Sequence, residues 1–236
     1  MDYSKTTLPN GLRIITIPMP TMLSASLVIL VGAGSRFEEE RINGVTHFLE
    51  HMLFKGTKKR PSAKKISEVI DSIGGEWNGS TGKENSSYYI KTATHNLDRA
   101  YDILCDMLSD SLLDAREIER EKGVIKSEIA MYEDMPARRV SEIFETLLYP
   151  NSSLGWDIAG VGATVDRVVR DDFTKLYEKF YIPENMVVAV AGGVQEKEVR
   201  ELTEKYLGQL KSQKFRQRRG SPKAAKFKIE KQVFIQ

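Results

Sequence analysis

The stretch His47-Phe48-Leu49-Glu50-His51 is the part of the sequence from which the rest of the chain can be interpreted. In an α-helix, residues three and four positions apart share a face, so His47, Glu50 and His51 can converge on one small volume. Two neutral imidazoles can hold a divalent cation, and a carboxylate that is not a ligand can accept a proton from water. The stretch therefore predicts a helix with a zinc (Zn2+) site, in which His47 and His51 are ligands and Glu50 is the general base.

The residues around this motif favour a buried site over a charged helix surface. Apolar side chains flank the motif on most sides: Phe48, Leu49, Met52, Leu53 and Phe54. Buried imidazoles and carboxylates need partners, which a metal would supply. The only other histidine of the chain, His95, follows a predicted strand and is expected to lie in a solvated turn.

A third protein ligand is expected, because catalytic zinc sites use three protein ligands and leave the fourth position to water. Glu121 and Glu128 are the candidates, since they lie seven residues apart and share one face of a predicted helix. An apolar stripe of Ile118, Val124, Ile125 and Ile129 would bury that face. Spacing alone does not decide between the two carboxylates.

These features together resemble the zinc-binding first half of the M16 metallopeptidases, the family of pitrilysin, insulin-degrading enzyme and mitochondrial processing peptidase. The order H-x-x-E-H is the inverzincin signature, and 76 residues lie between His51 and Glu128, as in the family. The resemblance implies that Glu128 is the third ligand and that Glu121 supports catalysis by orienting a histidine ligand. Further similar stretches are Leu8–Arg13, Gly32–Arg36, Gly56-Thr57, Gly74-Gly75 and Tyr181–Met186.

The resemblance also implies where a substrate would bind. An extended peptide can add as a strand to an exposed sheet edge, which here would be residues 76–80. Asn78, Gly79 and Ser80 are the expected substrate-binding residues, although many relatives carry a large side chain at the position of Ser80. Arg138 and Arg139 stand near positions where processing-peptidase relatives carry acidic residues, so a preference for arginine in the substrate is not carried over.

The composition is that of an ordinary globular protein. Of the 236 residues, 41% are hydrophobic and 29% charged, and the net charge of +2 gives no general attraction to nucleic acid or membrane. The single cysteine, Cys105, is expected in the core, and no apolar run approaches the length of a membrane span. With no visible signal or transit segment, a cytoplasmic location is expected.

The pattern of elements predicts an α+β fold: a mostly antiparallel sheet with helices packed on one face. The resemblance implies the same, a metallohydrolase half-domain like those of LuxS and the processing peptidases. We expect strands over 12–17, 24–31, 76–80, 86–94 and 186–191, helices over 44–54, 62–72, 97–111, 114–133, 138–148, 171–180 and 196–210, and a loop over 151–164. The interpretation divides the chain into a zinc-binding half-domain (1–210), a basic linker (211–225) and the start of a second half-domain (226–236), so that the chain is a fragment.

The function that follows is zinc-dependent hydrolysis of extended or unfolded peptides by the catalytic half of a two-half clamshell. The expected partners are peptide substrates and either a second half-domain of the same family or a second copy of the chain. The alternative is a non-catalytic partner or structural subunit. Such subunits usually lose part of the metal motif, and this chain retains all of it.

Overall fold

A six-stranded sheet organises residues 2–212, the part of the chain that the computed structural model describes. Its spatial order is β1-β2-β6-β3-β5-β4, and all neighbours are antiparallel except β2 and β6. The strands are β1 Ser4–Thr7, β2 Arg13–Pro18, β3 Ser24–Val31, β4 Glu76–Thr81, β5 Ser86–Ala93 and β6 Met186–Gly192. The predicted linker beyond residue 212 and the predicted terminal strand lie outside the described residues.

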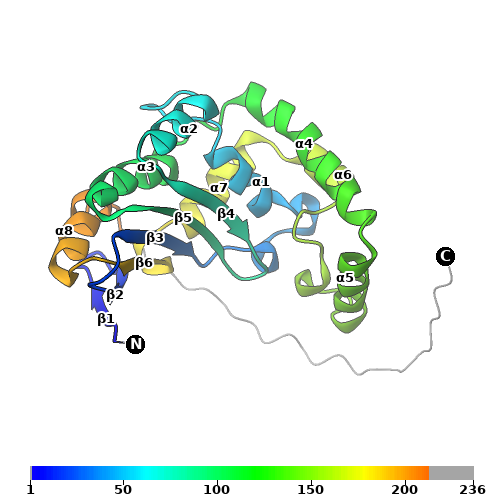
Figure 1. Cartoon of the computed structure of the whole chain (residues 1–236). Helices are drawn as coiled ribbons and strands as arrows, with labels where there is room; N and C mark the ends of the chain where they lie inside the picture. Colours follow the sequence, from blue (N-terminus) through cyan, green and yellow to red (C-terminus); the bar gives the residue numbers. More distant parts are fainter. Residues whose placement is uncertain (1, 213–236) are drawn as a thin grey trace.

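Eight α-helices accompany the sheet within this described part (Figure 1). They are α1 Val45–Leu53, α2 Ala63–Ser72, α3 Leu97–Ser109, α4 Ala115–Glu133, α5 Pro136–Leu148, α6 Gly162–Arg167, α7 Arg170–Phe180 and α8 Glu196–Leu207. Helix α3 packs on β5 and β3, α8 packs on β2, and α1 lies beside β4. Figure 1 shows α4 and α5 on the opposite side of the molecule from α8.

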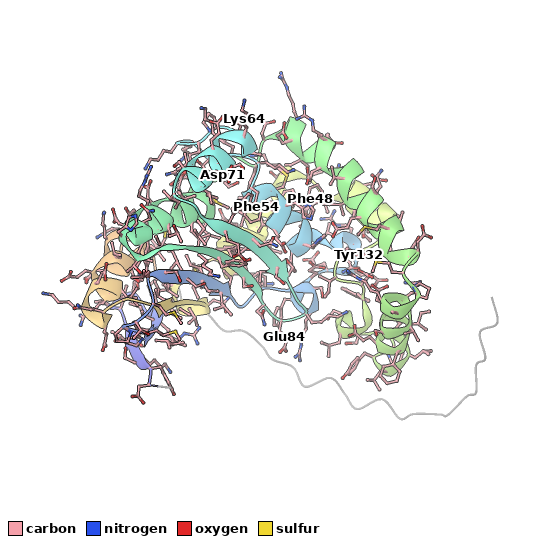
Figure 2. The ribbon with its side chains drawn as sticks, in the orientation of Figure 1. Phe48, Phe54, Lys64, Asp71, Glu84 and Tyr132 are labelled. Atoms are coloured by element: carbon pink, nitrogen blue, oxygen red, sulfur yellow. The ribbon has the colours of Figure 1, made fainter. Side chains whose placement is uncertain are left out.

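One face of the sheet carries the core. Buried residues alternate with half-buried ones along β3 and β6, as expected for strands that turn one face to helices. The buried set includes Leu27, Ile29, Val188 and Val190, which meet apolar side chains of the helices. Phe48 and Phe54, on and just after α1, point into this interior (Figure 2). The predicted α+β fold with helices on one face is therefore confirmed.

The strand predicted over 186–191 is also confirmed, and it is central, since β6 lies between β2 and β3. Its unbroken apolar sequence nevertheless has only one buried side. On the other side, Val187 and Ala189 are half-buried and lie opposite Leu30 and Val28 of β3. The open face of the sheet is thus apolar at its centre.

Several predicted boundaries differ from the structure: β1 is not among the predicted strands, and α3 and α8 end two and three residues earlier than predicted. Two further differences have an identifiable cause. The predicted loop over 151–164 contains a short 3-10 helix, Ser153–Gly155, and the first residues of α6. The position of helix α6 depends on a tertiary contact that the sequence pattern does not reveal. The Thr164 hydroxyl donates a hydrogen bond to the carbonyl of Asn43 at 2.7 Å. Helix α5 begins at Pro136, two residues before the predicted start, since proline fits the first turn of a helix.

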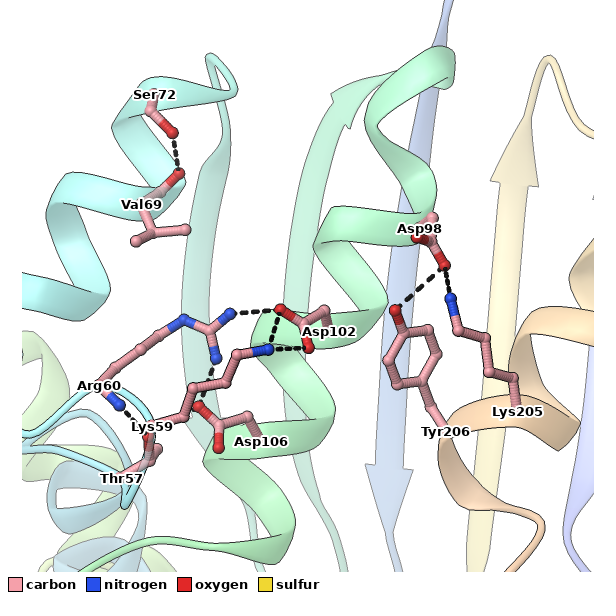
Figure 3. Close-up of polar contacts among 10 residues, drawn as sticks. All are labelled: Thr57, Lys59, Arg60, Val69, Ser72, Asp98, Asp102, Asp106, Lys205 and Tyr206. Carbon is pink, nitrogen blue, oxygen red and sulfur yellow. Dashed lines mark hydrogen bonds and ion pairs between the residues drawn. The ribbon is translucent and has the colours of Figure 1, made fainter.

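A buried ion-pair network fixes the segment that follows α1. Arg60 pairs with Asp102 at 2.5 Å and with Asp106, both on α3, and Thr57 donates to Asp106 at 2.7 Å (Figure 3). Because Arg60 is only 6% exposed, its buried charge would be left without a partner if both aspartates were lost. The network holds the segment that follows α1 against α3.

Two smaller expectations are confirmed. Cys105 is buried, and His95 is exposed in the 3-10 turn Thr94–Asn96. Trp77 packs against the core beside Phe54. No helix within residues 2–212 is long and apolar enough to cross a membrane.

Candidate metal centre

Helix α1 begins with a cap that comes from outside the helix. Both carboxylate oxygens of Glu38 accept hydrogen bonds at this end, from the backbone N–H of Gly44 at 2.7 Å and of Thr46 at 2.8 Å. A carboxylate at a helix N-terminus stabilises it by roughly 0.3–1 kcal/mol, and more when buried. Gly44 has φ +96°, and a Cβ there would lie 2.3 Å from the carbonyl oxygen of Ala159. The start of the motif helix is therefore fixed by Glu38 in the preceding loop and by the distant segment at Ala159.

The structure brings three predicted ligands together. The Nε2 atoms of His47 and His51 lie 3.3 Å apart. Oε2 of Glu128, on α4, lies 3.4 Å from Nε2 of His51 and 3.8 Å from Nε2 of His47. These three residues also form the one group within residues 2–212 whose His, Cys, Asp or Glu ligand atoms could hold a metal ion together.

The three residues fit a zinc ion. Ligand atoms at roughly 2.0–2.1 Å from a tetrahedral ion are themselves separated by about 3.3–3.4 Å, close to the separations of 3.3, 3.4 and 3.8 Å between these atoms. Two imidazole nitrogens and one carboxylate oxygen are a common donor set for catalytic zinc. The fit therefore rests on both the chemistry and the spacing of the donors.

Glu121 lies behind the ligands rather than among them. Its Oε1 is 2.9 Å from Nδ1 of His51, and its Oε2 is 2.6 Å from Nζ of Lys55. A carboxylate on Nδ1 fixes the ring so that Nε2 is presented to the other ligands. Glu121 is only 2% exposed, so the Lys55 ammonium is needed to balance its buried charge.

The pKa values of the two imidazoles are shifted in opposite directions. Burial, followed by the nearby charge of His51, lowers the pKa of His47 to about 4. For His51 burial acts in the same direction, but hydrogen bonds with Glu121 and Glu128 outweigh it and raise the pKa to about 9. The bond from His51, joined by one from Tyr132, lowers the pKa of Glu128 to about 2. His47 and Glu128 are thus in their ligand forms at neutral pH, whereas His51 must release a proton to become a ligand.

Glu50 occupies a separate position on the same helix. The hydroxyl of Thr81 on β4 donates to its Oε2, and a Cβ added at Gly79 would lie 2.8 Å from its Cγ. Burial raises the pKa of Glu50, although the Thr81 hydrogen bond opposes the shift. A carboxylate with a raised pKa is a better proton acceptor at neutral pH.

The ligands and Glu50 open onto one cleft of about 460 Å³. Its other walls come from β4, from the end of α4, from Arg138 on α5 and from Ile158 and Ala159. The predicted substrate-binding residues Asn78, Gly79 and Ser80 all line it. Asn78 and Ser80 are exposed, whereas Gly79 faces Glu50.

Sequence reasoning missed four residues that shape the centre: Glu38, Lys55, Thr81 and Tyr132. Tyr132 could have been found, because it lies one helical turn after Glu128 on the predicted face. Lys55 likewise follows His51 by four residues. Glu38 and Thr81 carry no such signal, since their contacts form between segments brought together only by the fold.

This chain is similar to known zinc proteases. Residues 13–161 match the profile of the insulinase family (peptidase family M16), and residues 167–236 match that of the peptidase M16 inactive domain. An uncharacterised zinc protease of Streptomyces coelicolor is 43% identical over 83% of this chain and 42% of its own length. Another, from Bacillus subtilis, is 39% identical over 86% and 49%. A probable mitochondrial-processing peptidase β subunit of Arabidopsis thaliana is 36% identical over 88% and 39%. The chain thus spans about half the length, or less, of these relatives.

Solved structures share the fold. A protease from Helicobacter pylori superposes with a TM-score of 0.85 at 27% identity, over 94% of this chain and 53% of that one. The first half of the periplasmic protease PqqL from Escherichia coli gives 0.83 at 27% identity, over 92% and 48%.

Proposed function

The chain belongs to the insulinase family, peptidase family M16, and on that premise we propose that it is the catalytic half of a zinc metalloendopeptidase. The observation that carries the proposal is the convergence of His47, His51 and Glu128 in one cleft with a carboxylate, Glu50, that is not a ligand. The complete motif speaks against the alternative, a non-catalytic subunit, because such a subunit needs neither the ligands nor the base. The zinc-binding half-domain would comprise residues 1–210.

Zinc bound by the three ligands would polarise the scissile carbonyl and lower the pKa of the attacking water. Glu50 accepts a proton from that water and passes it to the departing amine nitrogen. Thr81 holds the Glu50 carboxylate by one oxygen, which leaves the other free for this transfer. Glu121 keeps the His51 ring in the orientation that presents Nε2.

Peptide binding is supported by the edge of the sheet. Strand β4 ends the strand order and pairs only with β5 among the described strands, so its second edge is open beside the cleft. A peptide that pairs with this edge would lie extended across the ligands, held mainly by backbone hydrogen bonds. Asn78, Gly79 and Ser80 have small side chains, so this part of the cleft should discriminate little between substrate side chains of different size.

A second half is supported by two unpartnered apolar surfaces. On helix α5 the polar residues Arg138 and Glu142 are half-buried, with side chains 37% and 18% exposed, whereas Val140, Phe144 and Leu147 are 62%, 61% and 53% exposed. The open face of the sheet is apolar at its centre, around Val187 and Val28. Exposed apolar faces of this kind mark association surfaces. We propose that a second half-domain of the same family, or a second copy of this chain, covers them.

The test compares zinc content and peptide hydrolysis in the wild type and Glu50→Gln. The variant should bind zinc normally and lose hydrolysis of an unfolded peptide by at least about 100-fold, as expected for removal of a general base. Glu178→Gln, which alters an exposed carboxylate on α7, is the matched control and should retain activity. Wild-type turnover by Glu50→Gln, or a wild type that binds no zinc, would refute the proposal. Activity is measured in the presence of the second half where the chain alone is slow.

A further inference from the structure

A tyrosine hydroxyl is hydrogen-bonded to one of the two carboxylate oxygens of Glu128, the predicted third ligand. The Tyr132 hydroxyl donates to Oε1 of Glu128 at 2.6 Å. The other oxygen, Oε2, is the one that faces His51 and His47. Tyr132 follows Glu128 by one helical turn near the C-terminal end of α4 (Figure 2), so the contact needs no other element to form.

The tyrosine ring is in turn held from α5. The guanidinium carbon of Arg138 lies 3.2 Å from the centroid of the Tyr132 ring, a close cation–π contact. Nε of Arg138 donates to Glu142 at 2.9 Å, and Arg139 also contacts Glu142, at 3.3 Å. The Arg138 guanidinium is thus held by both Tyr132 and Glu142, and the chain of contacts Glu142–Arg138–Tyr132–Glu128 crosses the junction between α4 and α5.

We infer that Tyr132 is a positioning residue that makes Glu128 a ligand through one oxygen only, and that Arg138 holds Tyr132 in place for this role. The inference rests on the proposed zinc site, because it concerns how one ligand of that site is presented. Neither residue touches the reacting atoms, so neither is catalytic.

The physical reason lies in the symmetry of a carboxylate. Both oxygens of an unrestrained glutamate are equivalent donors, and its terminal torsion is broad, so it can rotate or bind through both oxygens. A hydroxyl that donates to Oε1 breaks that equivalence, because turning the group would give up a charge-assisted hydrogen bond. A ligand that uses one oxygen leaves room for water and substrate at the open position of the site.

The structure offers a matched pair of variants. Tyr132→Phe removes the hydroxyl and leaves the ring under Arg138. Tyr206→Phe on α8 removes a comparable hydroxyl, which donates to Asp98 of α3 at 3.1 Å (Figure 3). Helix α8 lies on the opposite side of the molecule from α4 (Figure 1). Arg138→Met removes the guanidinium and keeps the aliphatic stem, so it tests the second link without altering α4.

The readouts are zinc affinity, by competition with a chelator, and the visible spectrum of the protein loaded with Co2+. Tyr132→Phe should bind zinc about 10–100-fold more weakly, the usual loss when a partner of a metal ligand is removed. Its Co2+ absorption should weaken, because binding through both oxygens of Glu128 raises the coordination number. Arg138→Met should lose roughly two- to fivefold in affinity, and Tyr206→Phe should match the wild type in both measurements.

Each other outcome is informative. If Tyr132→Phe binds zinc within about twofold of the wild type and gives an unchanged Co2+ spectrum, the positioning role is wrong while the zinc site stands. If Arg138→Met is unchanged while Tyr132→Phe is impaired, the part assigned to Arg138 is wrong. If the wild type binds neither ion, both the inference and the proposed function fall. Should Tyr132→Phe not fold, Tyr132→Met takes its place with the same expected losses and the same overturning result, and Arg138→Met still tests the second link.

Discussion

Nδ1 of His51 lies 2.9 Å from Oε1 of Glu121, and this carboxylate is in turn balanced by Lys55, whose Nζ lies 2.6 Å from the second oxygen. Burial alone would raise the pKa of Glu121, but the contacts with His51 and Lys55 lower it and keep the group ionised. The orientation of His51 therefore depends on a lysine that touches no ligand.

Lys55→Met should accordingly weaken zinc binding by roughly tenfold and lower the thermal stability, because the buried Glu121 loses the partner of its charge. Chelator competition and thermal unfolding measure the two effects. Lys58→Met is the control, since Lys58 pairs with Asp110 at 3.1 Å on the exposed surface. Equal zinc affinity in Lys55→Met and the wild type would show that Glu121 orients His51 without the lysine.

A glycine opposite the proposed base gives a second test. Gly79→Ala would place a Cβ 2.8 Å from Cγ of Glu50, on a strand whose backbone accepts alanine. The carboxylate should shift, and hydrolysis should fall by about 10–100-fold with zinc content unchanged, because small displacements of a catalytic group are costly. Gly123→Ala on α4 meets no atom within 4 Å and should leave activity intact while stabilising the helix slightly. Full activity in Gly79→Ala would mean that Glu50 is not held in this position during catalysis.

The metal motif, its helix and the sheet could be predicted from sequence, because each rests on short-range periodicity. His47, Glu50 and His51 share a helix face by spacing alone, and β6 is recognisable from its unbroken apolar run. The third ligand needed more than periodicity, since Glu121 and Glu128 share a face and only the family spacing favoured Glu128. The contacts of Glu38 with α1 and of Thr81 with Glu50 could not be predicted from the sequence. They join residues whose proximity depends on the register of the sheet and the path of loops.

The opposite pKa shifts of the two histidines predict how zinc binding depends on pH. The pKa of His51 is raised to about 9 and that of His47 lowered to about 4. At about pH 7.5, His51 therefore carries a proton that zinc must displace, whereas His47 and Glu128 carry none to lose. Binding should release close to one proton, and affinity should rise with pH until about 9 and then level off. Calorimetric titration in buffers of different ionisation enthalpy measures the proton count, and a value near zero at that pH would contradict the assignment.

The exposed apolar face of α5 allows a test of whether a second half-domain docks there. Phe144 is 61% exposed on α5, so a partner that covers this face would bury a large apolar side chain. Phe144→Glu should weaken association with the second half-domain, or self-association of this chain, by at least about 100-fold, because a charge would enter an apolar interface. Peptide hydrolysis at limiting concentration should fall with it, while the zinc content stays unchanged.

Leu23→Glu is the control, because Leu23 is 88% exposed just before β3 and its replacement should change neither association nor hydrolysis. Sedimentation velocity and turnover are measured together. If Phe144→Glu associates and cleaves like the wild type, α5 is not the docking surface. A wild type that stays monomeric at every concentration and cleaves peptides as fast as a two-half relative needs no second half at all.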